Sequence, residues 1–98
     1  MNEPIPFLWT TRSLRNANSI SEYLQRRFTK KEVDRFERIL KEFEKTVSLF
    51  PELYPSSATV PNLRKAVVHK FTSVFYTFEN GEIVVIAMQD NRQEKPNE

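Results

Sequence analysis

Few side chains in this sequence could do acid–base or anion-binding chemistry, and most of them gather in one stretch. No acidic residue occurs between positions 53 and 78, and this stretch holds the only histidine, His69, together with Arg64, Lys65 and Lys70. Arginine and lysine can stabilise negative charge, whereas proton transfer near neutral pH needs a group such as histidine. The stretch is therefore locally basic, and His69 is its candidate acid or base.

Each of these candidates also has an ordinary structural interpretation. A lone histidine near a turn is more often a solvent-facing or hydrogen-bonded residue, and Tyr76, among apolar neighbours, suits a core position. Arg64 can pair across a sheet with Asp90 or Glu82. Arg92 lies two residues after Asp90 in the sequence, which puts both on one face of an extended chain. A structural ion pair between Arg92 and Asp90 is thus an alternative to a role in a site.

Composition sets the class of protein. The chain has 98 residues, a formal net charge of +2, no cysteine and one histidine. This predicts a single domain spanning 1–98, with a polar tail at 93–98, and excludes disulfides, thiolate metal sites and cysteine nucleophiles. A histidine-based zinc site is implausible, so we expect no metal and no cofactor. No apolar run reaches the length of a spanning helix, and the N-terminus lacks the pattern of a signal peptide.

Strand signals dominate the stretch from 64 to 92. Three apolar, strand-prone runs occupy positions 66–68, 74–76 and 83–88. Asn80 and Gly81 separate the last two runs and predict a tight hairpin, and a looser turn near 70–72 completes a three-stranded meander. The third run is apolar on both sides, which predicts a central strand covered on both faces. Three phenylalanines of the meander are predicted core residues, with base stacking as the alternative: Phe71, Phe75 and Phe78.

The first half of the chain predicts one short strand and two helices. Residues 5–9 form an extended apolar run, and a one-sided apolar stripe follows from Thr11 to about Arg27. Thr29 and Glu32 form the pattern of a capping box at the start of a second helix. Its apolar residues recur every three or four positions until Pro51 ends it at or before residue 50.

The resulting element order is β-α-α-β-β-β. It predicts an α+β fold in which a four-stranded, largely antiparallel sheet carries a helical hairpin packed on one face. The first strand is expected beside the last one, in a direction that the pattern leaves open. The proline-rich segment 51–62 serves as the connector between helices and sheet.

Over nearly its whole length the sequence resembles the RelE/ParE superfamily of type II toxin–antitoxin toxins, and within it the plasmid-stabilisation type common in bacteria. The opening phrase at 9–24, with Ile20, Tyr23 and Leu24, is similar to the strand and first helix of that family. Residues 63–70, 74–76 and 83–93 resemble its C-terminal meander. The phrase Asp-Asn-Arg-Gln at 90–93 is the most specific part.

The resemblance implies a small cytoplasmic toxin that a cognate antitoxin silences. Ribosome-dependent nucleases of the superfamily use several basic residues on the open sheet face and often a C-terminal tyrosine. Arg64 matches one basic position, and Arg92 lies at or beside another, but Ala66 and Ser73 stand where further cations would be expected. No tyrosine follows Arg92. These departures favour a toxin closer to ParE that inhibits an essential target such as DNA gyrase, so that enzyme activity is not the favoured expectation.

Two other hypotheses remain open at this point. One is a ribosome-dependent mRNA endonuclease whose catalytic candidates are Arg64, His69 and Arg92; the other is an inactive relative that only binds an antitoxin. For target binding we expect four cations, which are Arg64, Lys65, Lys70 and Arg92. For the antitoxin we expect a helix-in-groove surface on the helical hairpin, around Ile20, Leu24, Ile39 and Phe43. A homodimer or a hetero-oligomer with the antitoxin is possible, and no membrane association is expected.

Overall fold

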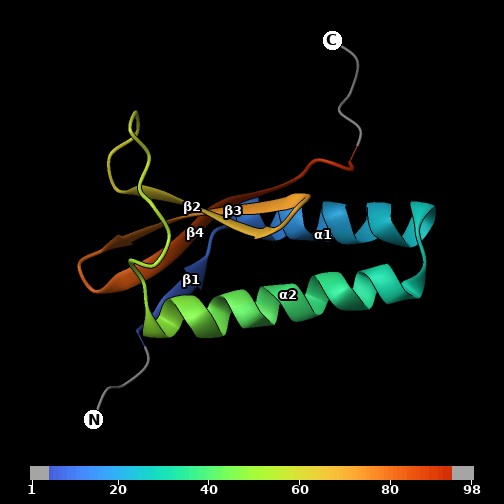
Figure 1. Ribbon diagram of the computed structural model, residues 1–98, viewed down its shortest axis with the longest axis horizontal. Helices are drawn as coiled ribbons and strands as arrows, with labels where there is room; N and C mark the ends of the chain where they lie inside the picture. The colour runs from blue at the N-terminus through green and yellow to red at the C-terminus, as the bar shows by residue number, and fades with distance from the viewer. Residues whose placement is uncertain (1–4, 94–98) are drawn as a thin grey trace.

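The computed structural model describes residues 5–93 and consists of two layers, a mixed four-stranded sheet and a helical hairpin (Figure 1). The element order confirms the predicted β-α-α-β-β-β arrangement. The elements are β1 (Phe7–Trp9), α1 (Thr11–Arg27), α2 (Lys30–Leu49), β2 (Leu63–His69), β3 (Thr72–Glu79) and β4 (Glu82–Asp90). No helix within the described part of the chain has the length and apolar character needed to cross a membrane. Of the polar tail predicted at 93–98, residues 94–98 lie outside the described residues.

The strand order of the sheet is β1-β4-β3-β2. The three C-terminal strands form the predicted antiparallel meander, and β1 pairs with β4 in parallel, which settles the direction that the sequence left open. Asn80 and Gly81 form the tight turn between β3 and β4, with φ angles of 54° and 73°. Positive φ at both positions is what a type I′ hairpin turn requires, and asparagine and glycine tolerate it best.

Replacing Gly81 by alanine is expected to lower the free energy of unfolding by about 1 kcal/mol, because φ is positive there. No atom outside its immediate chain neighbours lies within 4 Å of the position of the added Cβ, so the cost comes from the backbone and not from a clash. Urea denaturation followed by circular dichroism measures it. Asn80→Gly is the matched control and should change the free energy by less than about 0.5 kcal/mol. An equal loss in both variants would contradict the backbone explanation.

Strand β4 is central, as predicted, but the expectation that both of its faces are covered is wrong. Ile83, Val85 and Met88 are buried against the helices. Val84 and Ile86 face the opposite side of the sheet and are only half-buried. The helical hairpin covers only one face of the sheet. The apolar residues on the other face of β4 therefore lie on an open surface and are not covered by a second layer from residues 5–93.

The helix boundaries follow the sequence, but one predicted cap is not formed. Thr10 caps α1, since its hydroxyl oxygen accepts a hydrogen bond from the Ser13 N–H at 3.1 Å. Thr29 is the N-cap of α2 as expected, yet its side chain makes no capping hydrogen bond. A carboxylate oxygen of Glu32 lies 3.8 Å from Arg35, and that carboxylate adds an electrostatic interaction with Arg92. The predicted capping box is wrong because the Thr29 side chain accepts no capping hydrogen bond, and the carboxylate of Glu32 interacts with these two cations instead.

The core lies between the hairpin and the sheet. Both helices and the last three strands contribute to it, through Ile20, Leu24, Val33, Phe36, Phe43, Val47, Ala66, Val74, Tyr76, Ile83, Val85 and Met88. Strand β1 is tied to α2 by the indole of Trp9, whose Nε1–H donates to Glu44 Oε2 at 2.6 Å. This bond joins residues 35 positions apart in the chain and is partly shielded from water.

Glu44→Ala is expected to lower the free energy of unfolding by about 1–2 kcal/mol, because the partly buried Trp9 N–H loses a charged acceptor. Urea denaturation measures the change, and emission of the single tryptophan reports the environment of the indole. Glu42→Ala, at an exposed position of the same helix, is the control and should remain within about 0.5 kcal/mol of the parent chain. A loss at position 42 as large as that at 44 would show that helix charge matters more than the indole hydrogen bond.

Candidate functional site

The site residues predicted from sequence separate into two regions at opposite ends of α2. Arg92 and Asp90 form the first region. Arg92 donates from Nε to Asp90 Oδ1 at 3.0 Å and from Nη2 to Oδ2 at 2.8 Å, and its backbone N–H donates to Oδ1 at 2.9 Å. The Thr72 hydroxyl donates to Oδ2 at 2.7 Å. The Asp90 side chain is fully buried and that of Arg92 is 12% exposed. The alternative of a structural ion pair is therefore confirmed.

Aromatic rings and the first helix hold the Arg92 guanidinium in place. Its central carbon lies 4.8 Å from the centroid of the Phe71 ring and 5.7 Å from that of Phe28. The Tyr23 hydroxyl donates to the Arg92 carbonyl. Hydrogen bonding to Asp90 raises the pKa of Arg92, against the effect of burial. This guanidinium is charged and is bound to Asp90 through Nε and Nη2, which suits it to holding the end of β4 against the hairpin.

Arg64 lies in the second region and contacts the connector. Its Nη1 donates to the carbonyl of Tyr54 at 2.6 Å and to that of Glu52 at 3.4 Å. The alternative pairing with Asp90 or Glu82 is wrong, since the connector supplies backbone acceptors closer to Arg64 than either carboxylate. Arg64 thus closes the segment that follows α2, and its side chain is half-buried.

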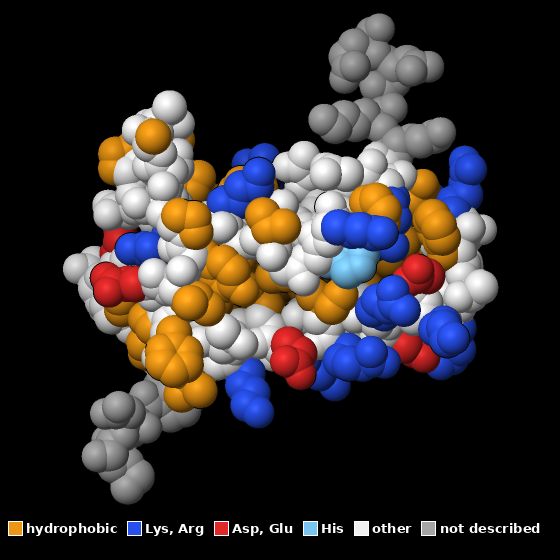
Figure 2. Space-filling model, viewed as in Figure 1, with side chains coloured by type: hydrophobic (Ala, Val, Ile, Leu, Met, Phe, Trp, Pro, Cys, Tyr) orange, Lys and Arg blue, Asp and Glu red, His pale blue; other side chains and the backbone are white. Residues whose placement is uncertain are grey.

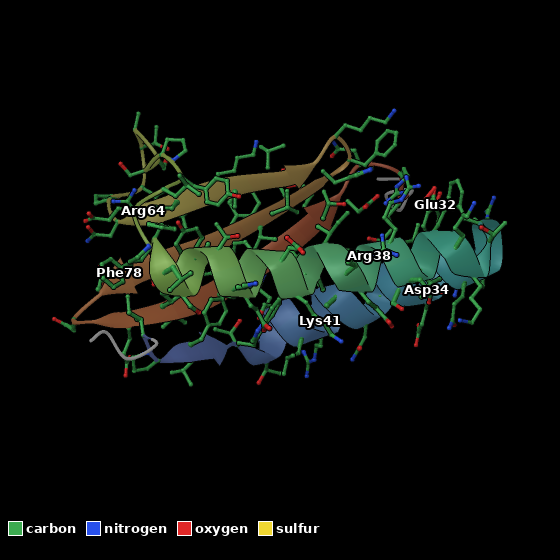
Figure 3. All side chains as sticks on the ribbon, turned by 60° about the horizontal axis from the view of Figure 1, so that its bottom comes forward. Glu32, Asp34, Arg38, Lys41, Arg64 and Phe78 are labelled. Atoms are coloured by element: carbon green, nitrogen blue, oxygen red, sulfur yellow. The ribbon has the colours of Figure 1, made fainter. Side chains whose placement is uncertain are left out.

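The two arginines do not converge on one site. Arg64 pairs with Tyr76 of β3, whereas Asp90 pairs with Thr72, so about 13 Å of strand separates their positions. Figure 3 shows Arg64 at the C-terminal end of α2 and Glu32, which interacts electrostatically with Arg92, at the opposite end. A phosphate held by Arg64 is out of reach of Arg92. The three catalytic candidates therefore do not form one constellation.

His69 lies with Lys70 and Phe71 at the turn between β2 and β3. The His69 Nδ1 accepts a hydrogen bond from the Phe71 N–H at 3.3 Å, and the two rings have centroids 5.6 Å apart. The Lys70 ammonium lies 5.2 Å from the Phe71 ring. The expectation of a hydrogen-bonded histidine near a turn is confirmed. His69, Lys70 and Arg92 thus surround one phenylalanine, but Nδ1 is already used as an acceptor.

Tyr76 is a core residue, as the ordinary interpretation predicted. It is fully buried, and its hydroxyl donates to the Pro51 carbonyl at 2.8 Å. Burial raises the pKa of Tyr76, while the nearby Arg64 acts in the opposite direction. A tyrosine whose proton is held by a backbone carbonyl and whose pKa is raised is a poor proton donor or acceptor at neutral pH. Tyr76 is therefore not available for acid–base catalysis.

The prediction that the three phenylalanines of the meander are core residues is wrong in part. Phe78 packs against the core, but Phe71 and Phe75 do not belong to it and are half-buried. Phe75 faces the open side of the sheet because β3 alternates and Val74 and Tyr76 occupy the helix side. The Lys65 ammonium lies 5.9 Å from the Phe75 ring.

Two adjoining hollows of about 290 and 390 Å³ share Leu63 and Phe75 on this open side. The lining residues of both include cations but no carboxylate. Arg12, at the start of α1, lines the larger hollow and was missed by the sequence reasoning. In the sequence, Arg12 lies on the solvent-facing side of an amphipathic helix. That pattern does not show that the start of this helix reaches over the open face of the sheet.

The antitoxin surface predicted on the hairpin requires correction. Ile20, Leu24 and Phe43 are 1%, 0% and 2% exposed. They form the contact between helices and sheet, and a partner cannot reach them as a set while the fold is intact. Ile39 is half-exposed and, together with one side of Phe43, lines a groove of about 360 Å³ between α2 and β2. The apolar stripe of α2 was predicted correctly, but most of its residues pack against the sheet and are not available to a partner.

A small two-layer α+β fold with one open sheet face and one helical hairpin is thus the class of this protein. Among solved structures, the chain is similar to one described as the chromosomal ParDE TA system from P. aeruginosa. The TM-score is 0.73, the sequence identity is 12%, and the match covers 88% of this chain and 95% of the other. The fold that the family resemblance implied is confirmed by this match. No protein-family model and no curated protein sequence matches the chain.

Proposed function

We propose that this chain is the toxin of a type II toxin–antitoxin system, that a cognate antitoxin neutralises it, and that it acts by binding DNA gyrase. The observation that carries the proposal is the fold, which is shared over 88% of this chain with a chain of a ParDE TA system. Such a toxin acts in the cytoplasm of a bacterium and arrests growth when the antitoxin is lacking.

Binding is favoured over RNA cleavage by the arrangement of the candidate residues. RNA cleavage requires a proton acceptor, a proton donor and cations around one phosphate. Arg92 is engaged with Asp90, Arg64 with connector carbonyls, and Tyr76 with Pro51. Ala66, at a position where the nuclease pattern has a cation, is fully buried. Of the four cations predicted for target binding, Lys65 and Lys70 are the two that are exposed.

A plasmid supercoiling assay with purified gyrase tests the proposed function. Micromolar chain is expected to leave the plasmid relaxed. Charge reversal at Lys65 and Lys70 should weaken this inhibition, and Lys41→Glu, an exposed lysine of α2, is the matched control. Undiminished supercoiling would reject gyrase as the target.

The nuclease alternative has a separate test. Translating ribosomes incubated with the chain are expected to show no codon-positioned mRNA cleavage. Cleavage that disappears in Arg64→Ala would establish the endonuclease instead. Expression in bacteria without growth arrest, together with no activity in either assay, would identify an inactive antitoxin-binding relative.

A further inference from the structure

The open face of the sheet carries a row of side chains that crosses three strands. Lys65 of β2 pairs with Phe75 of β3, and Phe75 pairs with Ala87 of β4. Residues paired in this way project from the same face of a sheet. Arg12, at the start of α1, lines the same hollow as Phe75 and Ala87. The row therefore has a cation at each end, with an aromatic ring and an apolar floor between them.

The charge of this face differs from that of the helix side. Two hollows lined by α2 hold charges of both signs, which are those of Lys30, Asp34, Glu37, Arg38 and Glu42. Figure 2 shows acidic and basic side chains mixed along the part of the molecule where Figure 1 shows α2. The two hollows of the open face are lined by Arg12, Arg64 and Lys65 and by no carboxylate. A partner with acidic groups is therefore complementary to the open face and not to the helix side.

The two cations that end the row have no carboxylate beside them. Arg12 and Lys65 are exposed, and neither side chain forms an ion pair in the part of the chain that the structure describes. Glu79 and Glu82 pair with each other at the far hairpin, about 13 Å along β3 from the row. The Asp90 side chain is fully buried. Both cations are thus free to meet carboxylates of another molecule.

The width of the row fits one α-helix. Lys65 and Ala87 are two strand spacings apart, about 10 Å, and Arg12 follows on the other side of β4. An α-helix with its side chains is about 10–12 Å across. A helix that lies over Phe75 would have Lys65 on one flank and Arg12 on the other. An apolar stripe with acidic residues on both sides of it would match this surface in shape and in charge.

Two other occupants fit the row less well. Single-stranded nucleic acid takes its affinity from several phosphate contacts and from bases stacked in succession. The row offers only Arg12, Lys65 and the ring of Phe75 for these contacts. A second copy of the chain would bring the same two cations against this face, and like charges oppose such an interface. The row therefore favours an acidic protein helix.

We propose that the open sheet face, with Phe75 at its centre and Arg12 and Lys65 on its flanks, docks an amphipathic helix of the target protein. The apolar stripe of that helix packs on Phe75, and acidic residues beside the stripe pair with the two cations. This inference rests on the proposed function, in which the target is gyrase, and it adds Arg12 and Phe75 to the target-binding residues. It also gives the apolar residues on the open face of β4 a second layer, which another chain supplies.

Biolayer interferometry of gyrase holoenzyme, free of DNA, on the immobilised full chain tests the proposal. Phe75→Ala should weaken binding at least about tenfold, because aromatic anchors at the centre of an interface carry much of its binding energy. Arg12→Glu should weaken binding at least about fivefold, because it replaces a complementary charge by a repulsive one. Circular dichroism verifies that both variants fold.

Each variant has a matched control away from the open face. Leu49→Ala removes an apolar side chain that is 61% exposed at the end of α2. Arg26→Glu reverses an exposed charge at the other end of α1, about 21 Å along the helix from Arg12. Both controls should bind gyrase within about twofold of the parent chain.

Photo-crosslinking covers the case in which Phe75→Ala does not fold. A benzoylphenylalanine at position 75 keeps an aromatic ring in the row and should crosslink to a gyrase helix that has acidic residues beside an apolar stripe. The same label at position 41, on the exposed side of α2, should give no such product. The proposal is overturned if the label at position 75 reacts only with DNA or with a second copy of the chain.

The remaining outcomes separate the docking surface from the proposed function. If gyrase binds either variant as tightly as the parent chain, or if a single-stranded oligonucleotide binds the parent chain and not Phe75→Ala, the docking surface is wrong and gyrase can remain the target. If the parent chain does not bind gyrase, that target is rejected, and growth arrest on expression decides about the surface. Arrest that both variants lose and both controls keep would support docking of another target protein there. Equal arrest in all of them would overturn the surface, and no arrest by the parent chain would overturn both proposals.

Discussion

Asp90→Ala is expected to lower the free energy of unfolding by about 3–5 kcal/mol, one of the two largest effects of a single substitution in this chain. The Asp90 carboxylate is fully buried and accepts hydrogen bonds from Thr72 and from three nitrogen atoms of Arg92. Its removal leaves a guanidinium that is 12% exposed without its counter-charge. Urea denaturation followed by circular dichroism measures the loss, and Asp34→Ala provides the control.

Asp34 pairs with Lys30 at 3.2 Å on the surface of α2, where the two side chains are 49% and 87% exposed. An exposed pair of this kind contributes less than about 0.5 kcal/mol. Equal losses at positions 34 and 90 would contradict the structural role of the buried pair. A loss at Asp90 below about 1 kcal/mol would show that Arg92 finds water or another acceptor at little cost.

The same carboxylate makes stability depend on acid. Burial alone would raise the pKa of Asp90, but hydrogen bonds from Arg92 and Thr72 outweigh it and lower the pKa below its ordinary value. A carboxyl group whose pKa is lower in the folded state stabilises the fold above its unfolded-state pKa, about 3.9. This contribution is lost as pH falls from there through the folded-state pKa. The difference in stability between the parent chain and Asp90→Asn should therefore shrink below about pH 4.

Most of the fold could be predicted because its signals are local. The Asn80–Gly81 turn fixes the hairpin of β3 and β4, and the spacing of apolar residues in α1 and α2 fixes which side of each helix meets the sheet. The coverage of β4 could not be predicted in this way. An apolar run on both sides of a strand indicates contact with something on both faces, and it does not tell whether the second layer belongs to the same chain.

The candidate site was less predictable because it depends on backbone groups and distant contacts. Arg64 and Arg92 could be picked out from the sequence as candidate cations, but their partners could not both be predicted. Arg64 binds the Tyr54 carbonyl and Arg92 binds the Asp90 carboxylate, and only Asp90 is close to its partner in the sequence. The pairing of the proline-rich connector with β2 has no side-chain signature either. It rests on backbone hydrogen bonds, of which the last joins the Lys65 N–H to the Pro55 carbonyl.

Phe43→Ala is expected to lower the free energy of unfolding by about 3–5 kcal/mol, because it empties the centre of the core. The Phe43 ring makes edge contacts with the rings of Phe7 and Tyr76, at centroid distances of 5.9 and 5.8 Å, and thereby joins α2 to β1 and β3. Thermal and urea unfolding measure the loss.

Ile39→Ala, one turn earlier on α2, is the matched control, since this residue is half-exposed in the groove. It should cost less than about 1.5 kcal/mol of stability. The two variants thus separate the buried part of the apolar stripe of α2 from its half-exposed rim, since Phe43 is 2% exposed. An equal loss of stability in both variants would contradict the central position of Phe43 in the core.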